Sequence, residues 1–121
     1  MSTQAPDRLL KLIENVNAFS AERDWAKFHT PKNLTMALTV EAAELMEIFQ
    51  WLEPHQDIKN LDEKKQEAVR HEVADIFIYL LRFCSVNNID LLQAAEEKLK
   101  HNAEKYPAEL VKGKAKKYTE Y

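Results

Sequence analysis

The stretch that decides the fold is VEAAELMEIFQW at residues 40–51, and EVADIFIY at residues 72–79 repeats its pattern. In each stretch two acids stand three positions apart: Glu41 and Glu44 in the first, Glu72 and Asp75 in the second. Apolar residues recur around the acids at helical intervals, which favours two amphipathic helices. Residues three apart lie on one face of a helix, so each pair directs its oxygens at a shared point.

The rest of the chain also has the pattern of helices. One glycine and four prolines among 121 residues are too few for the hairpins of a multi-stranded fold. Residues suited to an N-cap precede three of the expected helices: Thr30, Asp62 and Asp90, the last in a capping box with Gln93. We expect helices over about 7–21, 31–51, 62–87 and 90–106, followed over about 107–121 by a basic, partly mobile tail.

Length and composition bound the class of protein. A chain of 121 residues fits one domain, and its helical patterns predict an all-α four-helix bundle over residues 1–121. The apolar surface is generous for such a bundle, so we expect a homodimer or homotetramer to bury the excess. The second half of the third helix is apolar almost all round, and it should be the most buried element.

Charge and cysteine content exclude several partners. The net charge of -3 argues against a nucleic-acid polymer, because such binding needs an excess of Lys and Arg. No run of residues is long and apolar enough to span a membrane. The single cysteine, Cys84, cannot form an internal disulfide, and the N-terminus lacks the apolar segment of a secretory signal. We therefore expect a cytoplasmic protein.

The two acid pairs lack basic neighbours in their own helices. The positions four residues before and after each acid are uncharged, apart from His71 before Asp75, whereas Glu67 has Arg70 three residues on. An unpaired charge in an apolar stretch is costly. Solvated or cross-bridged acids are one interpretation. The other is that antiparallel packing joins all four acids in one site of oxygen ligands, which suits Mg²⁺ or Mn²⁺ and phosphate chemistry.

Two other features of the sequence concern the same site: the spacing of the histidines and the position of Glu47. A di-iron site would need Glu-x-x-His pairs, and no histidine stands three residues after Glu41, Glu44 or Glu72. Glu47 continues the spacing on the first helix. It either acts from the edge of the site, as a ligand or a base that orients water, or faces solvent.

The quoted segments closely resemble the MazG-like all-α NTP pyrophosphohydrolases, and within them the small single-domain dCTP pyrophosphatase branch. The resemblance continues through ERDW at 22–25, FH at 28–29, YP at 106–107 and KYTE at 117–120. It implies hydrolysis of a nucleoside triphosphate between the α- and β-phosphates, giving a nucleoside monophosphate and pyrophosphate. The role that it implies is house-cleaning of dNTPs with a dCTP-like preference.

The resemblance also implies the site residues. Members of the family bind Mg²⁺ through the four acids, which correspond to Glu41, Glu44, Glu72 and Asp75. The nucleoside is held by residues matching Trp25, Trp51 and Tyr79. Apart from the resemblance, His29 is a candidate for contact with substrate, and a cap or surface role is its alternative. The phosphates are held by residues of the last helix, here Lys98, Asn102, Lys105 and Tyr106, of which Lys98 and Asn102 are also catalytic candidates.

Two points of the resemblance stay open. Glu44 or Glu47 is the candidate for aligning the attacking water. Val16 stands where the branch has a histidine, so base or sugar selectivity is expected to differ. The alternative functions are a helical interaction or nucleotide-binding module without turnover, and a related pyrophosphohydrolase for another nucleotide such as phosphoribosyl-ATP.

Overall fold

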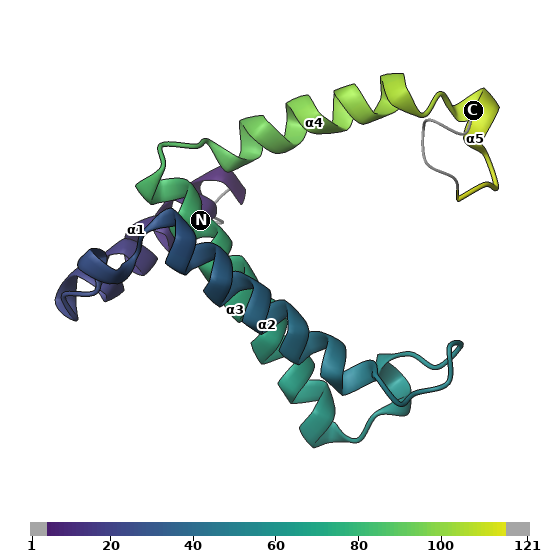
Figure 1. Cartoon of the computed structure of the whole chain (residues 1–121), viewed down its shortest axis with the longest axis horizontal. Coiled ribbons are helices and arrows are strands. Elements are labelled where there is room, and N and C mark those ends of the chain that lie inside the picture. The colour runs from purple at the N-terminus through teal and green to yellow at the C-terminus, as the bar shows by residue number, and fades with distance from the viewer. Residues whose placement is uncertain (1–4, 116–121) are drawn as a thin grey trace. The chain divides into compact units, whose positions relative to one another are not determined.

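The structure is a computed structural model that describes residues 5–115, so the end of the predicted tail from residue 116 lies outside the described residues. Every regular element of the described residues is a helix, which confirms the all-α class (Figure 1). Four helices are long: α1 (Ala5–Glu22), α2 (Pro31–Phe49), α3 (Glu63–Val86) and α4 (Leu91–Lys105). Two short elements lie between long helices, η1 (Ala26–Phe28) and η2 (Ile58–Asn60), and a third, α5 (Ala108–Val111), follows α4.

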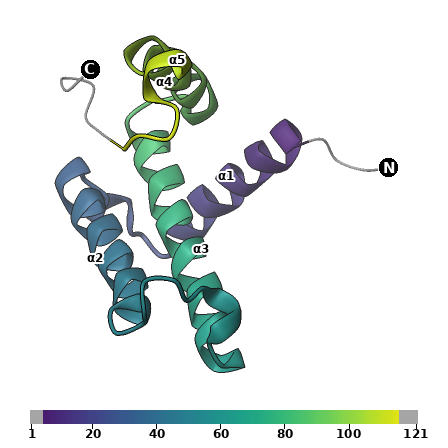
Figure 2. The ribbon, with the colours of Figure 1, turned by 90° about the vertical axis from the view of Figure 1, so that its right-hand side faces the viewer.

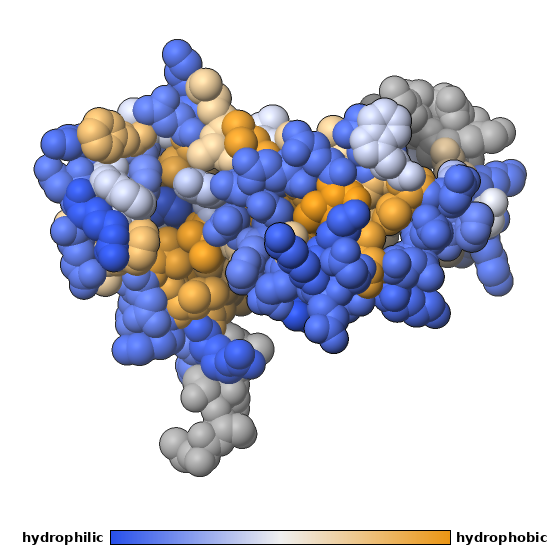
Figure 3. Space-filling model, turned by 90° about the horizontal axis from the view of Figure 1, so that it is seen from below, coloured by the Kyte–Doolittle hydropathy of each residue, from blue (hydrophilic) through white to orange (hydrophobic). Residues whose placement is uncertain are grey.

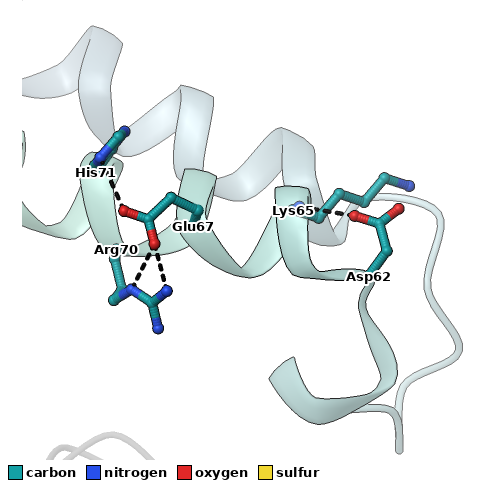
Figure 4. A network of polar contacts seen from close by, with 5 residues as sticks. All are labelled: Asp62, Lys65, Glu67, Arg70 and His71. Atoms are coloured by element: carbon teal, nitrogen blue, oxygen red, sulfur yellow. Dashed lines mark hydrogen bonds and ion pairs between the residues drawn. The ribbon is translucent and has the colours of Figure 1, made fainter.

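The last three long helices begin at the predicted caps. Each cap side chain accepts a backbone N–H three residues on: Thr30 from Asn33 at 3.1 Å, Asp62 from Lys65 at 2.8 Å, and Asp90 from Gln93 at 3.1 Å. Figure 4 shows the cap at Asp62. The side chain of Gln93 donates to Glu97 instead of returning to the cap, so Asp90 is a simple N-cap and the predicted capping box is half formed.

The predicted boundaries hold to within about two residues, and the short elements were missed. α2 ends at Phe49, two residues before the expected end at Trp51, and α5 lies inside the segment expected to be a tail. Asp24 and Asn88 each have φ 56 in the turns after α1 and α3. Asn and Asp tolerate this left-handed conformation better than most residues, which lets both helices end without a glycine.

The chain divides into two compact units, Met1–Asn88 and Ile89–Tyr121, and each is described by itself. The expectation of a single domain over the whole chain stays a prediction. In the first unit α3 packs against both α1 and α2. Figures 1 and 2 show that α2 and α3 run in opposite directions, as the acid pairs require. The first unit therefore holds the site described below.

The core of the first unit consists of a few apolar side chains: Leu34, Leu61, Val69, Leu81 and Cys84. Leu34 from α2 and Leu81 from α3 are each 1% exposed. The prediction that the second half of α3 is deeply buried holds for Leu81 and Cys84. It is wrong for Phe77 and Ile78, which are 40% and 38% exposed in a unit of only three long helices. Figure 3 shows apolar side chains at the surface among charged ones.

None of the helices that the structure describes is long and apolar enough to cross a membrane. The single free cysteine, Cys84, is buried in α3, and burial raises the pKa of its thiol. Cys84 therefore belongs to the core as a small apolar residue.

Candidate active site

Three of the four predicted metal ligands meet where α2 packs against α3. Carboxylate oxygens of Glu41, Glu72 and Asp75 lie within 4.8 Å of one another. Glu41 comes from α2, and the other two come from adjacent turns of α3. Antiparallel packing thus brings the two acid pairs together, as their spacing predicts. We call these three residues the acid cluster.

Glu44 and Glu47 lie along α2 beyond the acid cluster. Glu44 is exposed and close enough to Glu41 to affect its ionisation by repulsion and hydrogen bonding. Glu47, nearly one turn further along the helix, is exposed as well. The roles predicted for Glu44 as ligand and for either residue as the base stay predictions.

No Lys, Arg or His side chain within the described part of the chain forms an ion pair with the acid cluster. His71, which stands four residues before Asp75, instead lies 3.1 Å from Glu67, which also pairs with Arg70 (Figure 4). The pKa of Glu41 is raised to about 7. The largest cause is its hydrogen bond with Glu72, followed by partial burial and by repulsion from its acidic neighbours.

One oxygen of the acid cluster has no partner among the described residues. Glu72 Oε2 is buried and accepts no hydrogen bond from them. A buried anionic oxygen without a donor is costly, and natural proteins seldom leave one unsatisfied. A hard cation held between the carboxylates would satisfy it. The donors are all carboxylate oxygens, which fits Mg²⁺ or Mn²⁺ better than a metal that prefers thiolate or imidazole.

A cavity of about 340 Å³ opens beside the acid cluster. Glu41 and Asp75 lie in its wall, together with three predicted substrate-binding residues, Trp25, His29 and Tyr79. These five residues come from the segment between α1 and α2, from α2 and from α3. The structure therefore brings predicted metal ligands and predicted nucleoside contacts to one place.

The remainder of the cavity wall is largely apolar and aromatic. Val16, Phe19 and Ile78 contribute to it, and the rings of Phe19 and Trp25 meet edge to face with centroids 5.7 Å apart. Burial, followed by the nearby Glu41 and Asp75, raises the pKa of Tyr79. The phenol therefore keeps its proton at neutral pH and can donate a hydrogen bond. Such a cavity suits a flat, partly apolar group like a nucleobase.

The other predicted site residues lie elsewhere. Trp51 follows the end of α2, is 87% exposed, and is not among the described residues that line the cavity. The four predicted phosphate ligands belong to the second unit, with Lys98, Asn102 and Lys105 on α4 and Tyr106 at its C-terminal cap. Their predicted contacts with substrate remain predictions.

Arg82 lines the cavity, and sequence reasoning did not single it out. From α3 its Nε donates to His29 Nδ1 and its Nη1 donates to Asn17 Oδ1, each at 2.8 Å. A signal was present, because Arg82 is the one charged residue in the apolar run 76–84. A cation in such a run needs polar partners from other segments.

Comparisons with known proteins identify the family of the chain. The sequence profile of the MazG-like family matches residues 36–121. The chain is 38% identical to dCTP pyrophosphatase 1 of Mus musculus over 118 residues, which make up 96% of this chain and 69% of that protein. It is 36% identical to dCTP pyrophosphatase 1 of Homo sapiens over the same shares.

A solved structure of a pyrophosphatase from Archaeoglobus fulgidus superposes with a TM-score of 0.78 and 36% identity, covering 88% of this chain and 99% of that one. The helical fold and the relatives together define an enzyme of the nucleoside triphosphate pyrophosphohydrolase class. The chain belongs to the MazG-like family.

Proposed function

We propose that this enzyme hydrolyses deoxynucleoside triphosphates between the α- and β-phosphates, with a dCTP-like preference and a role in dNTP house-cleaning. The products are a nucleoside monophosphate and pyrophosphate. The observation that carries the proposal is the acid cluster, which pairs with no basic side chain among the described residues and lies beside an aromatic cavity whose wall contains Glu41 and Asp75. The relatives named dCTP pyrophosphatase 1 support the substrate class.

The proposed cofactor is Mg²⁺, with Mn²⁺ as a substitute, held by Glu41, Glu44, Glu72 and Asp75. The buried, unsatisfied Glu72 Oε2 and the all-carboxylate donor set support this assignment. When bound, such an ion neutralises charge on the phosphates and makes a water molecule more acidic.

The chain's own residues carry the remaining tasks. Glu44 or Glu47, both exposed carboxylates on α2, orients the attacking water and accepts its proton. Trp25 and Tyr79 hold the base in the cavity, which excludes water from the nucleoside. Trp51 stacks on the nucleotide if its large exposed ring is covered on binding.

The second unit supplies the proposed phosphate contacts. Lys98, Asn102 and Lys105 recur on α4 at spacings of four and three, and Tyr106 follows directly. Two ammonium groups on one helical face suit a polyphosphate chain. Lys98→Ala should raise KM for the triphosphate and lower kcat, whereas Lys100→Ala, a matched lysine on another face of α4, should leave both within about twofold.

The direct test is a panel of dNTPs, NTPs and phosphoribosyl-ATP incubated with Mg²⁺ in ¹⁸O-labelled water. Attack at the α-phosphorus places the label in the monophosphate and releases unlabelled pyrophosphate. Orthophosphate as the sole product would contradict the proposed bond cleavage. Nucleotide binding without any turnover would favour the alternative of a binding module, and in that case Glu44→Gln should leave the function unchanged.

The assembly and location are also proposals. We expect a homodimer or homotetramer, and the exposed apolar side chains of Met46, Phe77 and Leu99 support it. Light scattering across a dilution series measures the state, and a monomer at micromolar concentration would contradict the expectation. Cytoplasmic location and the absence of a nucleic-acid polymer as partner stay predictions from the sequence.

A further inference from the structure

Arg82 connects three segments of the first unit through a single guanidinium group. It lies on α3, and it donates to Asn17 on α1 and to His29 in the turn before α2, 65 and 53 residues away in the chain. Both bonds are 2.8 Å long and partly buried. Arg82 and His29 also line the cavity, so this polar network belongs to the wall around the proposed nucleoside.

The guanidinium fixes the direction of both hydrogen bonds. Arginine has only N–H donors and remains charged, so His29 Nδ1 must accept and cannot carry a proton. A neutral imidazole that accepts at Nδ1 carries its proton at Nε2. Burial and the charge of Arg82 both lower the pKa of His29, which keeps the ring neutral. The network thus selects one of the two tautomers of His29.

The backbone and the neighbouring ring also hold His29 in place. Its N–H donates to Ala26 O at 3.1 Å, and Asn33 Nδ2 donates to Phe28 O at 3.0 Å just before it. The ring meets Trp25 edge to face, with centroids 6.4 Å apart. Within the described residues, no acceptor is recorded for the Nε2 side of the ring. His29 therefore combines a fixed position with one donor left for a ligand.

We propose that Arg82 is a positioning residue that holds His29 as its Nε2–H tautomer, so that His29 donates a hydrogen bond to an acceptor atom on the substrate's base. The inference rests on the proposed function and adds a specificity-determining pair to it. In a mostly apolar cavity a fixed donor selects a base with a carbonyl such as O2 of a pyrimidine. A base without an acceptor there leaves the donor unpaired and binds more weakly.

The tautomer is tested on the full chain without nucleotide. Imidazole ¹⁵N spectra should show Nε2–H for His29 in the wild type and in Arg70→Met, which removes an exposed arginine from the same helix. Arg82→Met should shift His29 toward a mixture of tautomers or a protonated ring. Arg82→Lys, a milder change, should do so in part. An Nδ1–H wild type, or no change in either Arg82 variant, would overturn the inference.

Steady-state kinetics test the role in recognition. His29→Leu should raise KM for dCTP about fivefold to tenfold with kcat within about twofold, the size expected for one lost hydrogen bond. His29→Gln keeps an N–H donor and should recover part of the loss. Arg82→Met should raise KM by a similar factor, and the double variant with His29→Leu should be no worse than either, because the two residues act as one unit.

A matched substrate pair separates this role from general packing. Wild type should prefer dCTP over its 2-thio analogue, whose sulfur is a weak acceptor, and His29→Leu should lose that preference. Additive losses in the double variant, or equal discrimination in His29→Leu, would overturn the inference. Pyrophosphate release by the wild type tests the proposed function separately. An enzyme active on dCTP with unaffected His29 variants defeats only this inference.

Discussion

Two acids less than two turns apart on α3 have opposite surroundings. Glu67 contacts Arg70 and His71, and these neighbours, Arg70 first, lower the pKa of its carboxyl group (Figure 4). Glu72 instead faces Glu41 on α2 and leaves an oxygen buried without a donor among the described residues. There the pKa of Glu41 is raised to about 7. On one helix, therefore, Glu67 is paired with basic neighbours, whereas Glu72 lies among other acids.

The difference separates stability from function. A solvated pair such as Glu67 and Arg70 contributes little to folding, and its loss is easily tolerated. The acid cluster opposes folding because like charges approach and one oxygen is desolvated. A protein keeps such an arrangement where a ligand offsets it. The four predictions below compare matched changes at these two points.

The largest expected effect is on catalysis. Glu72→Gln should lower kcat for dCTP by on the order of 1,000-fold, because it removes a charged ligand of the metal from the site. Glu67→Gln, the same change five residues earlier, should stay within about twofold. Pyrophosphate release with Mg²⁺ measures both. Comparable losses in the two variants would mean that the acid cluster has no special role.

Metal binding should raise the thermal stability of the protein. Mg²⁺ at about 100 times its Kd should raise Tm of the wild type and of Glu67→Gln by roughly 10 °C, because binding to the folded state alone adds about 2.7 kcal/mol. Glu72→Gln should gain little. Calorimetry without nucleotide measures the shift, so the result does not depend on activity. An equal rise in Glu72→Gln would place the ion elsewhere.

The contributions of Glu41 and Glu67 to stability should change with pH in opposite directions. The folded-state pKa of Glu41 is raised from 4.5 to about 7, so its contribution to metal-free stability is full below pH 4.5 and is lost as pH rises to about 7. The pKa of Glu67 is lowered, so its contribution is present at neutral pH and is lost on acidification.

In EDTA, Tm of the wild type should fall by roughly 5 °C relative to Tm of Glu41→Gln between pH 5 and pH 8. Glu67→Gln should lower Tm more at the higher pH than at the lower one. Thermal unfolding at the two pH values gives both differences. A pH-independent difference for Glu41→Gln would show that its carboxyl titrates normally.

The smallest effect should follow from removing the partner of Glu67. Arg70→Met leaves that acid solvated and still in contact with His71, so Tm should fall by less than about 3 °C and kcat should be unchanged. Thermal unfolding and the pyrophosphate assay measure the two quantities. A loss as large as that of Glu72→Gln would mean that solvation does not distinguish the two acids.

Much of this arrangement could be predicted because it depends on local chemistry. N-caps at Thr30 and Asp62 satisfy backbone N–H groups within three residues, so they are readable from the sequence. The spacing of Glu72 and Asp75 is fixed by helical geometry alone. Their meeting with Glu41 needed one assumption, that two consecutive helices lie side by side and antiparallel, which is common for consecutive elements.

What was missed depends on contacts between distant segments. Arg82 meets Asn17 and His29 only after α1, α2 and α3 have packed, and no local spacing indicates that network. The exposure of Phe77 depends on how many neighbours surround α3, which periodicity does not report. His71 stands four residues from both Glu67 and Asp75, so helical spacing alone does not predict that it contacts Glu67.

The chain has two tryptophans, and their surroundings differ as sharply as those of the acids. Trp25 lies in the cavity wall against Phe19 and His29, whereas the ring of Trp51 is almost wholly in water. Trp25 is 43% exposed and Trp51 is 87% exposed, so their fluorescence should contain two components, of which that of Trp51 is quenched more readily by iodide. Replacing Trp51 with phenylalanine would leave Trp25 as a single intrinsic reporter of whatever enters the cavity, without any attached dye.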